Sequence, residues 1–431
     1  MSDIFSIEKC EELLPQCKCS EDYRISVILT CRNVSDFEAF NDILTNGPVF
    51  AVNTNFVITL SGNTVLPKGF LSGLFVSDLI VDDFQTQVEV DAFDGMRYLW
   101  QITVRKSSMK EIPDFRAIRS YLKILQLDNS HLTQLRGDNL KKLTRLQTLS
   151  FVNNSIAHVA EDVFQGTENV KYFDISHNLL TCLPPGLFKS WKGLEEVWLS
   201  YNQLLHVDRL FLGTNPQSIY LNNNNISDLS GMLHYSMWKL KKLKLSYNLI
   251  QGIAPNMFSG YSKNIDFLYL DHCLIREIDA QIWNEFFYME ELDLSFNLID
   301  KVTNNNNITN IKDRPFENTL RLDHNLFTSL GPALRYHRVW TFSMAHNLIA
   351  HLGPEDLQGD LRVRHLDLQG NVIAQVERLT FAKVRGLLLS LDLSRNRIKS
   401  LQGCLQSLIR LETLNLSHNR IEVSRFSLLN N

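Results

Sequence analysis

The stretch LETLNLSHNRI, residues 411–421, carries the spacing that decides the fold of this chain. Apolar residues stand at Leu411, Leu414, Leu416 and Ile421, and Asn419 lies between the last two. Neither a helix, with its period of about 3.6 residues, nor a strand, with its period of about 2, keeps to this spacing for long. The pattern instead predicts a short strand with leucines on one face, followed by a bend at the asparagine.

The same pattern recurs along most of the chain. Copies such as LKILQLDNSHL and LEEVWLSYNQL begin at Leu122 and Leu194. Successive asparagine anchors are about 21 to 28 residues apart, and about sixteen copies fit, which is the periodicity of a solenoid. The anchors are Asn63, Asn154, Asn178, Asn202, Asn224, Asn248, Asn297, Asn325, Asn347, Asn371, Asn396 and Asn419.

The anchor position explains why asparagine is repeated. Its amide both donates and accepts hydrogen bonds, so it can satisfy backbone groups that the bend buries. Smaller polar groups replace the asparagine at Ser107, Ser130 and Cys273. The side chain of Phe84 cannot form such hydrogen bonds, so we expect the repeat at Phe84 to be distorted. A second marker follows about ten residues later and is expected to pack between coils on the outer arc. It consists of Phe93, Phe164, Phe188, Phe211, Phe258 and Phe381.

The chain has seven cysteines, and Cys10, Cys17, Cys19 and Cys31 lie close together near its start. We interpret this cluster as a disulfide-tied cap in an oxidising compartment. Reduced cysteines in a cytosolic protein are one alternative. A zinc site is another, although C-x-C with long flanks is poor ligand spacing. The sequence alone allows three pairings.

The repeat L-x-x-L-x-L-x-x-N-x-L resembles the typical class of animal extracellular leucine-rich-repeat proteins. The resemblance implies an α/β leucine-rich-repeat solenoid, a horseshoe with a concave parallel β-sheet and an irregular or short-helical convex side. Residues 1–54 would then be a cysteine cap with the lead-in to the repeats, and residues 55–431 the solenoid. It also implies Cys10–Cys19 and Cys17–Cys31 bridges, which would close the otherwise exposed first coil.

The segments LPKGFLSGLFVSDLIV, DAFDGM and SMKEIPDF resemble more narrowly a group of arthropod secreted repeat proteins. That group is labelled the non-catalytic subunit of a luciferin monooxygenase, which implies a structural or partner role. The chain shows no signal peptide before the cap and no cysteine-rich flank after Asn419. We therefore expect a fragment of a longer protein, with a natural end at the last coil as the alternative.

Composition and motifs favour binding over catalysis. Apolar residues make up 44% of the chain and charged residues 21%, which is typical of a globular protein. The net charge of −4 argues against a nucleic-acid partner, and no apolar run has the length of a membrane helix. No nucleophile, phosphate-binding, metal-protease or dinucleotide motif occurs. We predict a non-enzymatic module without cofactor or metal; His324 and His346 share one column but are interpreted as solvated histidines.

The concave face is the default binding surface of a solenoid. Aromatic and acidic residues collect there, and tyrosine and tryptophan dominate many interfaces. The predicted protein-binding residues are Tyr172, Asp174, His177, Trp198, Tyr201, Tyr220, Tyr247, Phe267, Tyr269, His272, Asp293 and Phe296. For the residues directly before each anchor, packing at the bend is the alternative explanation.

These observations predict an extracellular or cell-surface module that holds a protein ligand. The alternatives are a non-catalytic subunit of a secreted oxidase complex, an intracellular repeat scaffold and a receptor ectodomain. N-glycosylation sequons occur at Asn33, Asn153, Asn225, Asn307 and Asn415. Their number is about what chance would give in an asparagine-rich chain, so they do not decide the compartment.

Overall fold

The computed structural model has two compact units, Met1–Pro216 and Gln217–Asn431, and each is described by itself. Its described residues are 6–21, 26–47, 50, 54–62, 65–82, 87–96, 98–229, 232, 237–254, 257–258, 264–284, 289–303, 317–334, 338–358, 361–401 and 403–422. The predicted distorted repeat at Phe84, the anchor Asn63 and the sequon at Asn307 lie outside these residues.

The first unit begins with the cysteine cap. Helices α1 (Ile7–Leu13) and α2 (Phe37–Asn46) flank strands β1 (Cys17–Glu21) and β2 (Val27–Arg32), which pair antiparallel. Disulfides join Cys10 to Cys19 and Cys17 to Cys31, as the family resemblance predicted. Strand β2 then pairs in parallel with the first repeat strand, so the cap covers what would be an open sheet edge.

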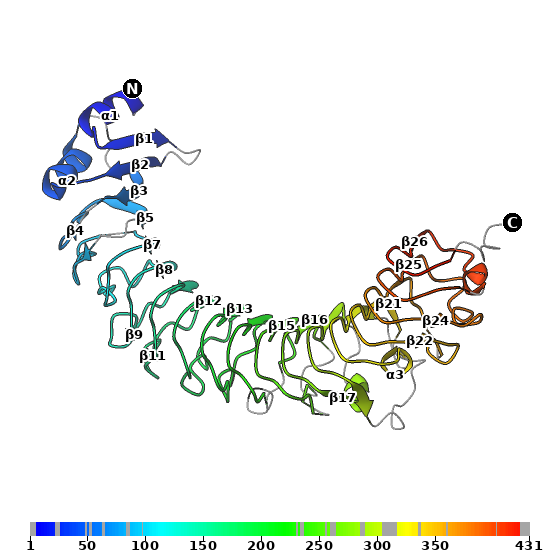
Figure 1. Ribbon diagram of the computed structural model, residues 1–431. Helices are drawn as coiled ribbons and strands as arrows, with labels where there is room; N and C mark the ends of the chain where they lie inside the picture. The colour runs from blue at the N-terminus through cyan, green and yellow to red at the C-terminus, as the bar shows by residue number, and fades with distance from the viewer. Residues whose placement is uncertain are drawn as a thin grey trace. The chain divides into compact units, whose positions relative to one another are not determined.

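The remaining strands of the first unit form a parallel sheet, and Figure 1 shows them side by side. They are β3 (Asn55–Ser61), β5 (Phe75–Asp82), β7 (Gln101–Arg105), β8 (Ile124–Asp128), β10 (Thr148–Ser150), β12 (Tyr172–Asp174) and β13 (Glu196–Trp198). On the opposite side of the coils, two-residue strands pair as β4 (Val65–Leu66) with β6 (Gln87–Val88) and β9 (Gln134–Leu135) with β11 (His158–Val159).

The second unit repeats this arrangement. Its parallel sheet contains β14 (Ser218–Tyr220), β15 (Lys242–Lys244), β16 (Phe267–Tyr269), β18 (Glu291–Asp293), β20 (Glu317–Arg321), β21 (Val339–Ser343), β23 (His365–Asp367), β25 (Ser390–Asp392) and β26 (Thr413–Asn415). Small pairs lie opposite: β17 (Glu277–Asp279) with β19 (Lys301–Thr303), and β22 (His351–Leu352) with β24 (Gln375–Val376). Three short helices accompany them: η1 (Ala280–Asn284), α3 (Gly331–Leu334) and η4 (Cys404–Ser407). The predicted leucine-rich-repeat solenoid is confirmed.

The core of each unit is a column of side chains from the strand centres. Leu125, Leu149, Phe173 and Val197 stand opposite one another on successive strands, and each is 0% exposed. The predicted burial of the phenylalanine marker is confirmed, because all six of its members are at most 3% exposed. Each coil therefore hides its apolar side chains only by lying against its neighbours.

The asparagine ladder links successive coils through the backbone. Asn178 Oδ1 accepts from the N–H of Ile156 at 2.9 Å, while its Nδ2 donates to the carbonyls of Phe151 at 2.8 Å and Ile175 at 3.0 Å. One buried amide thus satisfies backbone groups on its own coil and on the preceding one, as predicted. The replacement Cys273 is buried, and its thiol donates to a carbonyl. Within the described part of the chain, no helix has the length and apolarity needed to cross a membrane.

Candidate functional site

In the three-residue strands the central side chain points into the core and its two neighbours point away. In β15, Leu243 is buried while Lys242 and Lys244 are half-buried. We call the outward positions the exposed sheet face of each unit. Seven of the predicted binding residues lie on it: Tyr172, Asp174 and Trp198 in the first unit, and Tyr220, Phe267, Tyr269 and Asp293 in the second.

The residues of the first unit are held by polar contacts. The hydroxyl of Tyr172 donates to Glu195 Oε2 at 2.7 Å, and Lys171 Nζ forms an ion pair with Glu195 Oε1 at 2.9 Å. The Asp174 carboxylate accepts from the N–H and the hydroxyl of Ser176, at 2.9 and 2.6 Å. Burial raises the pKa of Asp174. The carboxylate of Asp174 therefore stabilises the bend after its strand, whereas the hydrogen bond to Glu195 holds the ring of Tyr172 in place.

On the second unit, Tyr220, Lys244, Tyr269 and Asp293 stand opposite one another on successive strands. The ammonium nitrogen of Lys244 lies 5.0 Å from the ring centroid of Tyr269 and 5.9 Å from that of Tyr220. These distances are those of cation–π contacts. Two tyrosine rings therefore flank one lysine, and all three side chains are half-buried rather than freely mobile in solvent.

The second outward column of this unit contains Lys242, Phe267 and Glu291. Lys242 Nζ lies 5.2 Å from the centroid of Phe267. Glu291 accepts from the hydroxyl of Tyr269 at 2.9 Å and pairs with Arg321 Nε at 2.9 Å. Burial and the Glu291 contact both raise the pKa of Tyr269. Glu291 thus anchors one aromatic ring and neutralises one cation.

A separate feature of the second unit is a row of rings directly before the anchors. Neighbouring rings are parallel to within 13°, with centroids 4.1 to 4.4 Å apart. Every member has left-handed backbone, with φ between 53° and 57°. We call this row the ring stack; its members are Tyr247, His272, Phe296, His324 and His346. In the first unit, His177 and Tyr201 stack in the same way at 4.2 Å.

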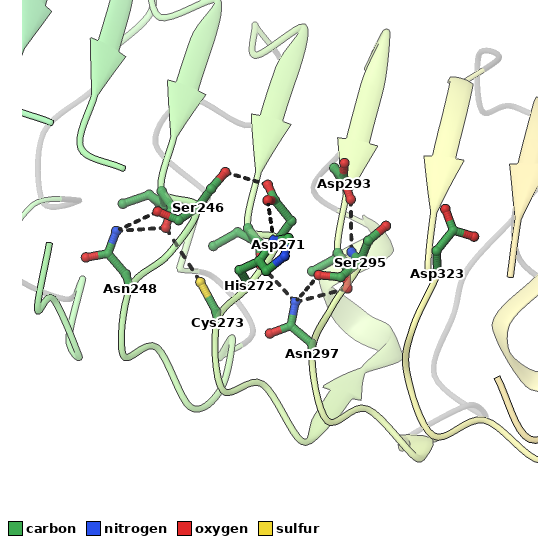
Figure 2. A network of polar contacts seen from close by, with 12 residues as sticks. Ser246, Asn248, Asp271, His272, Cys273, Asp293, Ser295, Asn297 and Asp323 are labelled. Carbon is green, nitrogen blue, oxygen red and sulfur yellow. Dashed lines mark hydrogen bonds and ion pairs between the residues drawn. The ribbon is translucent and has the colours of Figure 1, made fainter. Parts of the chain in front are cut away.

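Figure 2 shows a network of polar contacts at the bends after neighbouring strands of the second unit. Asp271 accepts from the hydroxyl of Ser246 and lies 2.9 Å from Nδ1 of His272. Asp293 accepts from the N–H of Ser295 at 2.9 Å, and burial raises its pKa, with the negative charge of Asp271 adding to the effect. Asp271 and Asp293 therefore make several of their hydrogen bonds within the fold.

One group of possible metal ligands occurs among the described residues. His351, Glu355 and Asp356 bring ligand atoms within 4.8 Å of one another. However, the two oxygens of Asp356 accept from the backbone N–H groups of Gly331 at 3.0 Å and Gly353 at 2.9 Å. Asp356 therefore stabilises a turn, and this cluster carries no metal proposal.

The sequence reasoning passed over Arg321, which the structure places on the exposed sheet face beside Glu291. Its position in the strand column was a signal that could have identified it. Of the sequons, Asn33, Asn153 and Asn225 are exposed. Nδ2 of Asn153 donates to Asn129 at 2.7 Å, and Nδ2 of Asn415 donates to Asp392 at 2.9 Å.

Sequence comparison finds the repeat and several relatives. The leucine rich repeat model matches residues 120–180, 214–275 and 361–421. Podocan-like protein 1 of Mus musculus is 26% identical over 385 residues, covering 82% of this chain and 66% of that protein. Podocan of Mus musculus is 26% identical over 329 residues, covering 72% of this chain and 50% of podocan. Fibromodulin of Mus musculus is 29% identical over 175 residues, covering 38% of this chain and 44% of fibromodulin.

Solved structures share the fold. A leucine-rich-repeat protein of Leptospira interrogans is 20% identical with a TM-score of 0.61, covering 83% of this chain and 88% of its own. A chain of the Toll–Spatzle complex of Drosophila is 19% identical with a TM-score of 0.61, covering 94% of this chain and 63% of its own. The comparisons give no support to the narrower resemblance with the arthropod monooxygenase-subunit group. Repeats and solved structures agree that this chain has the leucine-rich-repeat fold, and it is similar in sequence to podocan and fibromodulin.

Proposed function

We propose that this chain is a non-enzymatic, extracellular module that binds a protein ligand on the exposed sheet face. Podocan, fibromodulin and lumican are extracellular-matrix leucine-rich-repeat proteins, and the sequence similarity supports the same environment here. The Toll–Spatzle complex is an example of this fold in a protein–protein complex. The chain spans only 66% and 50% of podocan-like protein 1 and podocan, so the activity of a whole relative is not transferred to it.

The observation that carries the proposal is the fixed aromatic row of the second unit. Tyr220, Phe267 and Tyr269 are half-buried and held by Lys242, Lys244 and Glu291. Rings that are already positioned lose little conformational freedom when a partner covers them. Tyrosine is also enriched among the interface residues whose truncation costs most.

The binding proposal is tested with the full chain and the double variant Tyr220→Ala/Tyr269→Ala. Proteins of conditioned culture medium are captured on the immobilised chain and identified by mass spectrometry. We expect the variant to lose a set of proteins that the wild type retains, since truncating a hot-spot ring typically costs about 2 kcal/mol, or about 30-fold in affinity.

The matched control is Leu379→Ala/Ile409→Ala, which removes apolar side chains that are 63% and 78% exposed and lie outside the strands of the same unit. This control is expected to capture the wild-type set. Circular dichroism melts verify that both variants fold. If the tyrosine variant captures the same proteins as the wild type, the binding surface is not this face.

The extracellular assignment has its own test, because disulfides persist mainly in oxidising compartments. Protein isolated from its native source is alkylated before digestion and mapped without reduction. We expect peptides linked through Cys10–Cys19 and Cys17–Cys31. Alkylated, free thiols at Cys10 and Cys31 would favour the intracellular scaffold instead.

A further inference from the structure

Strand β15 presents two lysines on the exposed sheet face of the second unit. Lys242 and Lys244 flank the buried Leu243 and point to the same side. Alternate residues of a strand are about 6.6 to 6.8 Å apart, so the two ammonium groups originate at that separation. This spacing equals that of alternate side chains in any extended peptide.

Neither lysine has an ion pair with a carboxylate among the residues that the structure describes. Other cations of the same unit are neutralised: Lys241 pairs with Asp266 at 3.3 Å and Arg321 with Glu291 at 2.9 Å. The ammonium groups at β15 are therefore not neutralised by an ion pair, unlike Lys241 and Arg321.

The contacts that do hold these lysines are aromatic. Lys242 lies over Phe267, and Lys244 lies between Tyr220 and Tyr269. A ring attracts an ammonium group through its quadrupole but carries no net charge, so it positions the lysine without neutralising it. The rings also displace water from around the charges, which strengthens their interaction with an incoming anion.

The carboxylates of the neighbouring coils have other partners. Asp271 accepts from Ser246 and lies beside His272, and Asp293 accepts from the N–H of Ser295. Glu291 lies two strands away from β15, about 9.4 to 9.8 Å by strand spacing. Its oxygens are occupied by Tyr269 and Arg321. Charge complementarity therefore selects a partner that is negative at this position.

We propose that Lys242 and Lys244, with the rings of Tyr220, Phe267 and Tyr269, bind an acidic segment of a partner protein. The segment is extended and carries carboxylates on alternate residues, one against each lysine, while its backbone and side-chain methylenes pack on the rings. This inference rests on the proposed function and names the partner chemistry at that face. Each contact is a charge-assisted hydrogen bond, which is stronger than a neutral one.

The test uses the full chain and a fluorescein-labelled peptide of alternating glutamate and glycine, followed by fluorescence anisotropy. We expect Lys242→Gln/Lys244→Gln to weaken peptide binding by about tenfold or more, because close charge pairs at interfaces couple strongly. The matched control is Lys241→Gln/Lys301→Gln, which removes the same net charge from lysines that are already paired with Asp266 and Glu277. The control is expected to bind the peptide as the wild type does.

Several results would overturn the inference. The wild type could fail to bind the peptide, or both double variants could lose the same amount of peptide affinity. The wild type could also bind a heparin oligosaccharide but not the peptide. The medium-capture experiment separates this inference from the proposed function. If Lys242→Gln/Lys244→Gln keeps the captured proteins that Tyr220→Ala/Tyr269→Ala loses, the acidic-segment inference fails while the binding face stands.

Discussion

The imidazole ring of His272 lies parallel to the phenyl ring of Phe296, with centroids 4.2 Å apart and 12° between the planes. Both residues have left-handed backbone directly before an anchor position, which Cys273 occupies after His272 and Asn297 occupies after Phe296. Strands of adjacent coils lie about 4.7 to 4.9 Å apart, so side chains at equivalent bend positions must stack or separate. The sequence left packing at the bend open as the alternative role of these residues, and the stacked rings show how that packing is made. A binding role for the same rings stays a prediction.

The ring stack predicts unequal costs of truncation. Phe296 has a ring on each side, whereas Tyr247 at the end of the stack has a ring contact with His272 alone among the residues that the structure describes. Each aromatic contact is worth about 0.5 to 1.5 kcal/mol beyond buried area. We expect Phe296→Ala to lower the free energy of unfolding by about twice as much as Tyr247→Ala, measured by urea denaturation. Equal costs would show that the stacking itself contributes little.

Stability should fall on acidification through His324. Partial desolvation of the His324 ring, which remains exposed on one side, and the neighbouring His346 lower the pKa of His324 below the ordinary value of 6.5, while Asp323 opposes the shift and His272 adds to it. The unfolded chain then binds more protons than the folded chain, so stability is complete above pH 6.5 and is lost as the pH falls below it.

The variant His324→Phe keeps a ring in the stack and removes the titrating group; Phe296 shows that phenylalanine is accepted at this backbone geometry. We expect it to lose less stability than the wild type between about pH 7.5 and about pH 5.5 in urea denaturation. His206→Phe, at an exposed histidine outside the stack, is the control and should retain the wild-type pH dependence. An unchanged pH dependence in His324→Phe would contradict the assignment.

The asparagine ladder predicts a large loss for Asn297→Ala. Asn297 accepts from the N–H of Ile275 at 3.1 Å and donates to the carbonyls of Leu270 at 2.8 Å and Leu294 at 3.0 Å. Buried backbone groups left without a partner cost about 1 to 3 kcal/mol each, so we expect a loss of about 3 kcal/mol or more in thermal or urea unfolding. A loss below about 1 kcal/mol would mean that water replaces the amide.

Cys273 occupies an anchor position, so an asparagine can be restored there instead of removed. Its thiol donates to the carbonyl of Leu245 at 3.5 Å, and burial raises its pKa to about 11, so it stays protonated. Sulfur is a weak acceptor, whereas an asparagine oxygen is a strong one. We expect Cys273→Asn to raise the free energy of unfolding by about 1 kcal/mol, and Cys273→Ala to give no gain. Destabilisation by Cys273→Asn would show that this coil has adapted its shape to the thiol.

The sequons predict selective glycosylation when the chain is expressed through a secretory pathway. Asn225 is exposed, whereas Nδ2 of Asn415 donates to Asp392. We expect the glycan at Asn225 and an unmodified Asn415 in glycopeptide mapping. Asp392→Ala releases the amide of Asn415 and should increase its occupancy. Full occupancy of Asn415 in the wild-type chain would show that this hydrogen bond does not restrict the transferase.

The sequence by itself determined the repeat and its interior. Leu125, Asn178 and Phe164 were assigned to the strand core, the bend and the space between coils from spacing alone. This was sufficient because each coil of a solenoid contacts only its neighbours, so a local period specifies the packing. The cysteine pairing came from the family resemblance, since spacing allowed three connectivities.

Only the tertiary structure decided how the outward side chains are partnered. Glu291 pairs with Arg321 from the following coil, and Lys242 and Lys244 contact rings instead of carboxylates. Their contacts depend on the lateral register of coils whose lengths differ, and on which of several neighbours a long side chain reaches. A repeat pattern fixes which side chains point outward, but the pairing among them is a property of the assembled sheet.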